Sequence, residues 1–80
     1  MSEDEIRDLI ADIIVDVAPE IDLSEATGDE NLQHRFGLDS MDALMILEEI
    51  AEQTGIEIPE TDYDQVESLD GLTAYVAQRV

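Results

Sequence analysis

The stretch GLDSMDALMILEEIAEQTG, residues 37–55, decides the fold because its pattern is that of one amphipathic helix between two glycines. We expect the helix to run from about Ser40 to Thr54, with Gly55 as its left-handed stop. Apolar residues recur on one face, which contains Ala43, Leu44, Ile46, Leu47, Ile50 and Ala51. The outer face carries acids but no basic residue: Asp42, Glu48, Glu49 and Glu52, with Met41 and Met45 near this acidic side.

A first helix is predicted upstream of this stretch. Ser2 and Glu5 have the spacing of a capping box, in which each side chain accepts a hydrogen bond from the other residue's backbone N–H. Ala18-Pro19 should end the helix, because a residue before proline is pushed out of the helical region. One apolar stripe follows the three- and four-residue steps of a helix: Ile6, Leu9, Ile10, Ile13 and Val17.

The remaining segments are a long connection and two later helices. Residues 18–38 are expected to be a loop, pinned across the core by apolar residues scattered through it. A brief helix is expected near residues 62–67. A last helix should start at about Asp70 and turn these residues inward: Leu69, Leu72, Val76 and Val80. The predicted fold is all-α, a four-helix bundle with a long loop between its first two helices and a short third helix, in a single domain spanning residues 1–80.

Charge and composition restrict the partners. The 80 residues include 22 Asp plus Glu against 3 Lys plus Arg, for a formal net charge of -19. This balance argues against nucleic acid and against an anionic membrane surface, and it favours a basic protein surface. Hydrophobic residues make up 44% of the chain, enough for a small core. With no cysteine, no long apolar run and an acidic N-terminus, we expect a cytoplasmic monomer without membrane insertion.

Catalytic and metal-binding groups are few. His34 is the only histidine, and we interpret it as a solvated loop residue and not as a general base. Asp62, Asp64 and Glu67 resemble the start of a calcium loop, but Val66 occupies a ligand position and no glycine supplies the turn. The sequence therefore predicts neither an enzyme nor a metal site.

Ser40 stands in the first turn of the central predicted helix. A phosphate ester is well accommodated there, beside unpaired backbone N–H groups and the positive end of the helix dipole. The simpler interpretation is that Asp39 or Ser40 is only the N-cap of the helix. The spacing of the residues leaves both interpretations open.

A family resemblance favours the first interpretation. Gly37-Leu38-Asp39-Ser40-Met41-Asp42 is similar to the Asp-Ser-Leu motif of acyl carrier proteins, with Met41 where leucine is usual. The segments 47–50 and 55–59 resemble the family's glutamate-rich helix end and its Ile-Pro crossing, and the run from Ser68 opens the last helix in the family's manner. The resemblance covers essentially the whole chain.

The resemblance implies a mechanism. Ser40 would be the attachment point for 4′-phosphopantetheine, which a separate phosphopantetheinyl transferase (holo-acyl-carrier-protein synthase) takes from coenzyme A with magnesium. This arm would carry acyl groups as thioesters between acyl-loading and condensing enzymes of fatty-acid, polyketide or related specialised biosynthesis. The chain itself would be a carrier and not an enzyme.

The resemblance also assigns a recognition face, and it does not decide whether there is a groove for the acyl chain. Asp39, Asp42, Glu48 and Glu52 match positions where similar proteins meet basic patches on partner enzymes. Met45 stands where the family usually has glutamate; with Met41 it forms a soft apolar strip that favours a dedicated carrier for a specialised pathway. Four further apolar residues either open a groove for an acyl chain or belong to the core: Leu44, Leu47, Ile50 and Ile58.

Two alternatives remain at this stage. The Asp-Ser-Met run and residues 55–64 are also similar to D-alanyl and other aminoacyl carrier proteins, although these usually have glycine where Asp42 stands. An acidic protein-interaction module without a cofactor is the alternative from another functional class.

Overall fold

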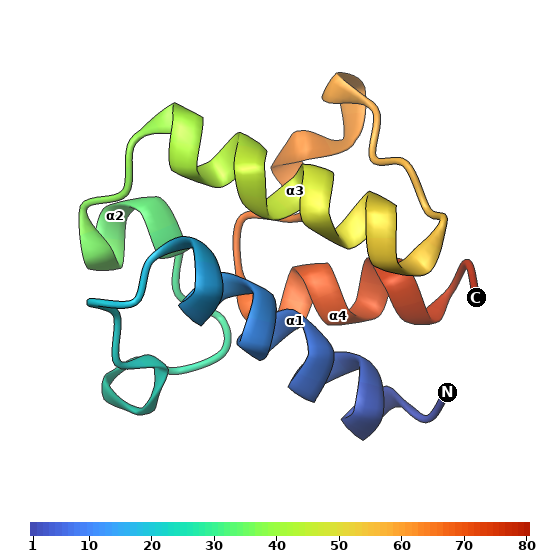
Figure 1. Cartoon of the computed structure of the whole chain (residues 1–80), viewed down its shortest axis with the longest axis horizontal. Helices are drawn as coiled ribbons and strands as arrows, with labels where there is room; N and C mark the ends of the chain where they lie inside the picture. The colour runs from blue at the N-terminus through green and yellow to red at the C-terminus, as the bar shows by residue number, and fades with distance from the viewer.

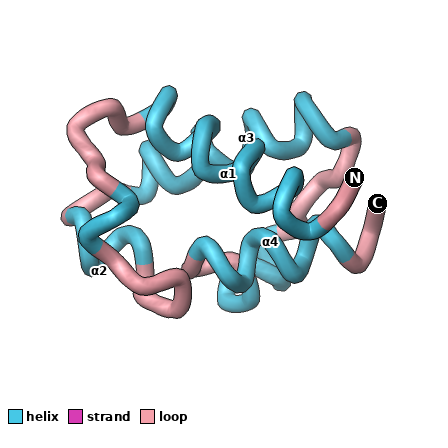
Figure 2. The backbone as a smooth tube through the Cα atoms, turned by 90° about the horizontal axis from the view of Figure 1, so that it is seen from below, coloured by secondary structure: helices cyan, strands magenta, loops and turns pink.

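The computed structural model describes residues 1–80 and contains only helices and connecting segments, as predicted. The α-helices are α1 (Glu3–Val17), α2 (Leu32–Phe36), α3 (Ser40–Thr54) and α4 (Leu69–Ala77). Two 3₁₀ helices, η1 (Leu23–Glu25) and η2 (Glu60–Gln65), lie in the connections. Helix α1 packs against both α3 and α4, and Figures 1 and 2 show α2 at the end of the molecule away from the two termini.

Helix α1 confirms the predicted capping box. The Glu5 N–H donates to Ser2 Oγ over 3.2 Å, and the Ser2 N–H donates to Glu5 Oε1 over 3.1 Å. The hydrogen bonds from the Ser2 backbone and hydroxyl lower the pKa of Glu5. The buried stripe includes Ile14, which the sequence stripe omitted, beside Ile6, Ile10 and Ile13. Burial of each such side chain contributes about 1.5–3 kcal/mol, so this stripe anchors the core.

The prediction of a continuous loop over residues 18–38 was wrong, because this connection contains η1 and α2. Asp22 caps η1 by accepting from the Ser24 N–H over 3.0 Å. Asn31 caps α2 by accepting from the His34 N–H over 3.0 Å, and Gly37, with a φ of 65°, ends it. A helix of five residues is too short for a hydrophobic period to reveal it.

The connection is pinned, as expected. The Leu32 N–H donates to the Glu67 carbonyl and the Asp70 N–H to the Gly28 carbonyl, both over 2.9 Å. Arg7 pairs with Asp70 over 2.7 Å beside Gly28. A Cβ at Gly28 would overlap both side chains of that ion pair, so glycine permits this close approach. Backbone hydrogen bonds with Glu67 and with Asp70 of α4 thus hold the connection on the bundle, and three of its own side chains are buried: Ile21, Leu32 and Leu38.

Two details of the C-terminal part differ from the prediction. The short helix expected near residues 62–67 is the 3₁₀ helix η2, and it begins directly after Pro59. Val80 was predicted to face inward but is 61% exposed, because α4 ends at Ala77 and does not carry the helical period that far. Tyr75 is buried instead and donates from its hydroxyl to Asp62 Oδ2 over 2.6 Å. This bond raises the pKa of Tyr75 and ties η2 to α4.

Helix α3 occupies the predicted residues and ends at Gly55, whose φ of 75° confirms the left-handed stop. Ile46 and Ile50 are its buried residues. Leu44, expected on the apolar face, is 39% exposed. None of the helices combines the length and the apolarity that a membrane crossing requires.

Candidate functional site

Ser40 is the first residue of α3 and lies exposed directly after the turn from α2. Gly37 in its left-handed conformation ends α2, and Leu38 is buried before the chain enters α3. Asp39 is the N-cap and accepts from the Asp42 N–H over 2.9 Å. Because Asp39 performs the capping, the Ser40 hydroxyl is not needed to start the helix. Ser40 is thus an exposed residue without a capping role at the positive end of a fifteen-residue helix.

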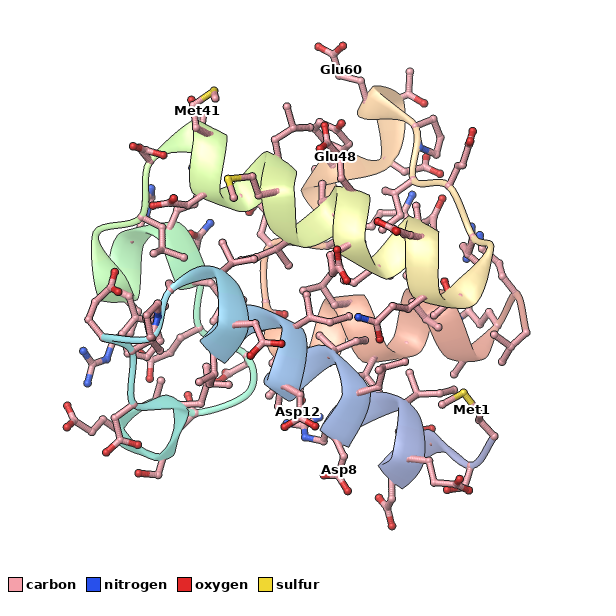
Figure 3. The ribbon with its side chains drawn as sticks, in the orientation of Figure 1. Met1, Asp8, Asp12, Met41, Glu48 and Glu60 are labelled. Carbon is pink, nitrogen blue, oxygen red and sulfur yellow. The ribbon has the colours of Figure 1, made fainter.

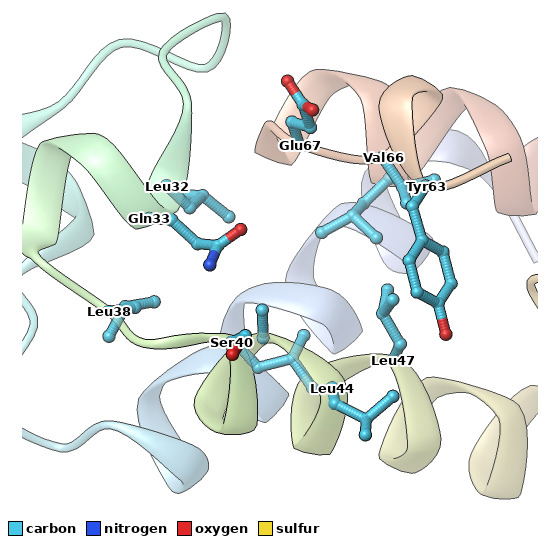
Figure 4. Close-up of a pocket in the computed structure, with 12 residues that line it drawn as sticks. Leu32, Gln33, Leu38, Ser40, Leu44, Leu47, Tyr63, Val66 and Glu67 are labelled. Atoms are coloured by element: carbon cyan, nitrogen blue, oxygen red, sulfur yellow. The ribbon is translucent and has the colours of Figure 1, made fainter. Parts of the chain in front are cut away.

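A cavity of about 160 Å³ opens beside Ser40. Figure 4 shows residues of α2 on one side of it, η2 and the segment after it on the other, and α3 along the floor. Its walls are mainly apolar, and its polar side chains are those of Ser40, Gln33, Glu67 and Tyr63. Its other lining residues are Leu32, Leu38, Ala43, Leu44, Ile46, Leu47, Val66 and Leu72. An apolar group attached near Ser40 therefore has a hollow within the protein next to it.

A second cavity of about 270 Å³ lies further along α3. It is lined by Leu44, Leu47, Glu48, Ala51, Glu57, Ile58 and Tyr63. Of the four groove candidates, Leu44 and Leu47 line both cavities and Ile58 lines only the second. Ile50 is fully buried and lines neither, so it belongs to the core alternative.

The outer face of α3 combines exposed acids with exposed methionines. Met41 is 66% exposed and Met45 48% exposed; Figure 3 shows Met41 and Glu48 projecting from this face. Asp39, Glu48 and Glu52 are exposed, and Asp42 is half-buried. A shallow hollow of about 420 Å³ between α1 and α3 places Met45 among carboxylates, with these lining residues: Asp16, Val17, Glu48, Glu49 and Glu52.

All three arginines are engaged away from α3. Arg7 pairs with Asp70 over 2.7 Å, and Arg35 pairs with Glu30 over 3.4 Å. The Arg79 guanidinium lies 3.4 Å from the centre of the Tyr75 ring, in a cation–π contact. The carboxylates of α3 therefore have no basic partner within the chain, and their negative potential is directed outward.

The residues considered for catalysis and metal binding do not form a cluster. His34 is exposed in the last turn of α2. No group of three His, Cys, Asp or Glu side chains is arranged to hold a metal ion.

Several residues of the site had no signal in the sequence. Leu32, Gln33, Tyr63 and Val66 line the cavity beside Ser40, yet they come from α2, η2 and the residue after η2. Each looks like an ordinary helix or loop residue in its own segment. Only the packing of α2 and η2 over α3 brings them together.

Comparison with known proteins gives a consistent result. The family model described as phosphopantetheine attachment site matches residues 4–76. An acyl carrier protein of Guillardia theta is 31% identical over 80 residues, covering all of this chain and 98% of the relative. An acyl carrier protein of Streptomyces coelicolor is 31% identical, with 96% of this chain and 79% of the relative covered. The mitochondrial acyl carrier protein 2 of Arabidopsis thaliana is 27% identical over 96% of this chain, which spans 60% of that relative's length. No solved structure matches this chain significantly.

Proposed function

Because this chain belongs to the acyl carrier protein family, a family of carriers and not of catalysts, we propose that Ser40 is its 4′-phosphopantetheine attachment site. The observation that carries the proposal is the Ser40 hydroxyl itself, which is exposed, relieved of capping by Asp39 and adjacent to an apolar cavity. The attached group supplies a thiol on which cargo is held as a thioester.

The residues around Ser40 fit that group. The first turn of α3 offers backbone N–H groups and a positive dipole end to a phosphodiester on Ser40. Asp42, which follows in the same turn, uses its N–H to bond Asp39, so the turn is ordered before any group is attached. No side chain of the protein needs to activate the hydroxyl, because the transferase that recognises the chain performs that chemistry.

An acyl cargo suits the cavity better than an amino-acid cargo. Its lining is mainly apolar, with Glu67 as its one charged residue. The relatives quoted above are named acyl carrier proteins, which favours an acyl group over the D-alanyl or other aminoacyl alternative. An acidic interaction module without a cofactor would have no use for a cavity beside an exposed serine.

The outer face of α3 is the proposed partner surface. It would meet the phosphopantetheinyl transferase and the acyl-loading and condensing enzymes, through these residues: Asp39, Met41, Asp42, Met45, Glu48 and Glu52. The support is the absence of any basic partner for these carboxylates within the chain, together with the exposure of both methionines. We propose a dedicated carrier of a specialised acyl or polyketide pathway, acting as a cytoplasmic monomer.

The test is modification in vitro. The protein is incubated with coenzyme A, magnesium and a broad phosphopantetheinyl transferase, and the intact mass is measured. The parent should gain one phosphopantetheine, and Ser40→Ala should gain none while keeping its helical circular dichroism. Ser24→Ala and Ser68→Ala are matched controls that should be modified like the parent. Cofactor on Ser40→Ala, or none on the parent, would overturn the assignment.

A further inference from the structure

The two cavities along α3 share part of their walls. Leu44, Leu47 and Tyr63 line both, and no other residue does. Leu44 and Leu47 belong to α3 and form a common floor. Tyr63 comes from η2, on the other side of the hollow, and Figure 4 shows its ring beside Leu47 at the end of the first cavity opposite Leu32 and Gln33. The Tyr63 side chain is therefore the part of the shared wall that lies opposite α3.

From this arrangement we infer that Tyr63 limits the length of the acyl chain that the protein can shelter. The inference rests on the proposed attachment at Ser40. A chain that starts near Ser40 and enters the first cavity runs over Leu44 and Leu47 and meets the Tyr63 ring. Beyond the ring lies the second cavity, which carries Glu48 and Glu57 in its lining. In the parent protein the Tyr63 ring stands between that space and a chain coming from Ser40.

The backbone that carries Tyr63 is held in place. Its neighbour Asp62 accepts from the Tyr75 hydroxyl over 2.6 Å, which fixes η2 to α4. The Asp62 N–H donates to the Pro59 carbonyl over 2.9 Å, and the Val66 N–H to the Tyr63 carbonyl over 3.2 Å. The Tyr63 hydroxyl, by contrast, makes no hydrogen bond within the chain. The ring and not the hydroxyl is thus the part that divides the cavities, and Tyr63→Phe is a matched control.

The limit should be visible in how the sheltered fraction of the acyl chain depends on its length. Each methylene that moves from water into an apolar cavity shifts the equilibrium toward the sheltered state about fourfold. The gain should stop once the chain reaches the ring, because further methylenes stay in water. In Tyr63→Ala the chain can continue along Leu47 into the second cavity, so the gain should continue to longer chains.

The experiment uses the full chain carrying an acyl-phosphopantetheine on Ser40, in an even-numbered series from butyryl to dodecanoyl. The transferase moves each acyl-phosphopantetheine from the corresponding acyl-coenzyme A to the Ser40 hydroxyl and releases adenosine 3′,5′-bisphosphate. The rate at which hydroxylamine cleaves each thioester reports how much of the cargo is unsheltered. In the parent and in Tyr63→Phe the rate should fall with chain length and level off at the same length. In Tyr63→Ala it should level off at least one member of the series later.

Two further arms keep the outcome decisive. If Tyr63→Ala is not folded by circular dichroism, Tyr63→Leu replaces it and should also shift the limit to longer chains. A ¹³C label on the terminal methyl should show a nuclear Overhauser effect to the Tyr63 ring at the limiting length in the parent. Loading is scored separately by intact mass, so failure of the proposed function appears as unmodified protein. Identical limits in fully loaded parent and variant, or no dependence on chain length in the loaded parent, would overturn the role of Tyr63.

Discussion

Met45 is the residue at which this chain departs most clearly from what its sequence resembles. Met45 is 48% exposed on α3 and lines the hollow with Val17 and four carboxylates, so it is not part of the buried core. A flexible thioether among uncompensated acids suits a partner that offers an apolar contact within a basic surface. Burial of one methionine contributes roughly 1.5–3 kcal/mol before ordering costs, enough to change affinity about tenfold.

Met45→Glu tests that role. An exposed site tolerates such a change, so the free energy of unfolding should stay within about 0.5 kcal/mol of the parent. The variant should work better than the parent with a generic fatty-acid ketosynthase, because it restores the glutamate that similar carriers usually have. Val15→Glu is the matched control. Val15 is 40% exposed on α1, so its substitution adds the same charge outside α3. Activity equal to the parent's would show that the methionine strip carries no specificity, and unfolding would show that Met45 is structural.

At the scale of the element, side-chain caps mark where each α-helix begins. Glu5, Asp22 and Asp29 each accept hydrogen bonds from nearby hydroxyls or backbone N–H groups, and these bonds lower the pKa of all three carboxyls. A carboxyl with a lowered pKa stabilises the folded state above its ordinary pKa, and this stabilisation is lost as the pH falls through the lowered value. Asp39 is both the N-cap of α3 and an exposed charge beside Ser40.

Substitutions at Asp39 separate its cap from its charge. Asparagine caps a helix about as well as aspartate, so Asp39→Asn should keep the stability of the parent. Its modification by the transferase should be slower at low salt, and the difference should shrink as salt screens the encounter. Asp39→Ala should in addition lose about 0.5–2 kcal/mol in chemical denaturation. Equal transferase rates for parent and Asp39→Asn at low salt would show that this charge does not guide the partner.

At the scale of the whole molecule, charge works against compactness. The net charge is -19, and the three arginines offset it only near Asp70, Glu30 and Tyr75. Repulsion among the remaining carboxylates destabilises the folded state, and salt screens it over a Debye length of about 10 Å at 0.1 M. The core that opposes it is built on four isoleucines of α1, with Ile46 and Ile50 from α3 and Leu72 and Val76 from α4.

The melting temperature should therefore rise with sodium chloride and rise again with millimolar magnesium or calcium. Thermal unfolding followed by circular dichroism measures both effects. Choline chloride at matched ionic strength is the control, since it screens charge without a divalent cation. A melting temperature that does not change across these conditions would contradict the idea that self-repulsion limits stability.

Local patterns in the sequence were sufficient for the long helices. The stripe of α1, its capping box and the two bounds of α3 depend on residues within a few positions of one another, so they can be predicted without knowing the fold. These features are set by backbone hydrogen bonding and helical periodicity, which the sequence states directly. The proposed role of Ser40, by contrast, came from the family resemblance of the Asp-Ser-Met run, because the spacing of the residues left its interpretation open.

Tertiary packing decided everything that joins distant segments. Helix α2 has only five residues and is held by the Leu32 N–H bond to the Glu67 carbonyl, a contact no local pattern predicts. The cavity beside Ser40, and the wall that Tyr63 contributes to it, arise where α2, α3 and η2 meet. Ile50 and Leu44 are both apolar residues of α3, yet Ile50 belongs to the core and Leu44 to a cavity wall. Their burial differs because it depends on which element packs opposite each residue.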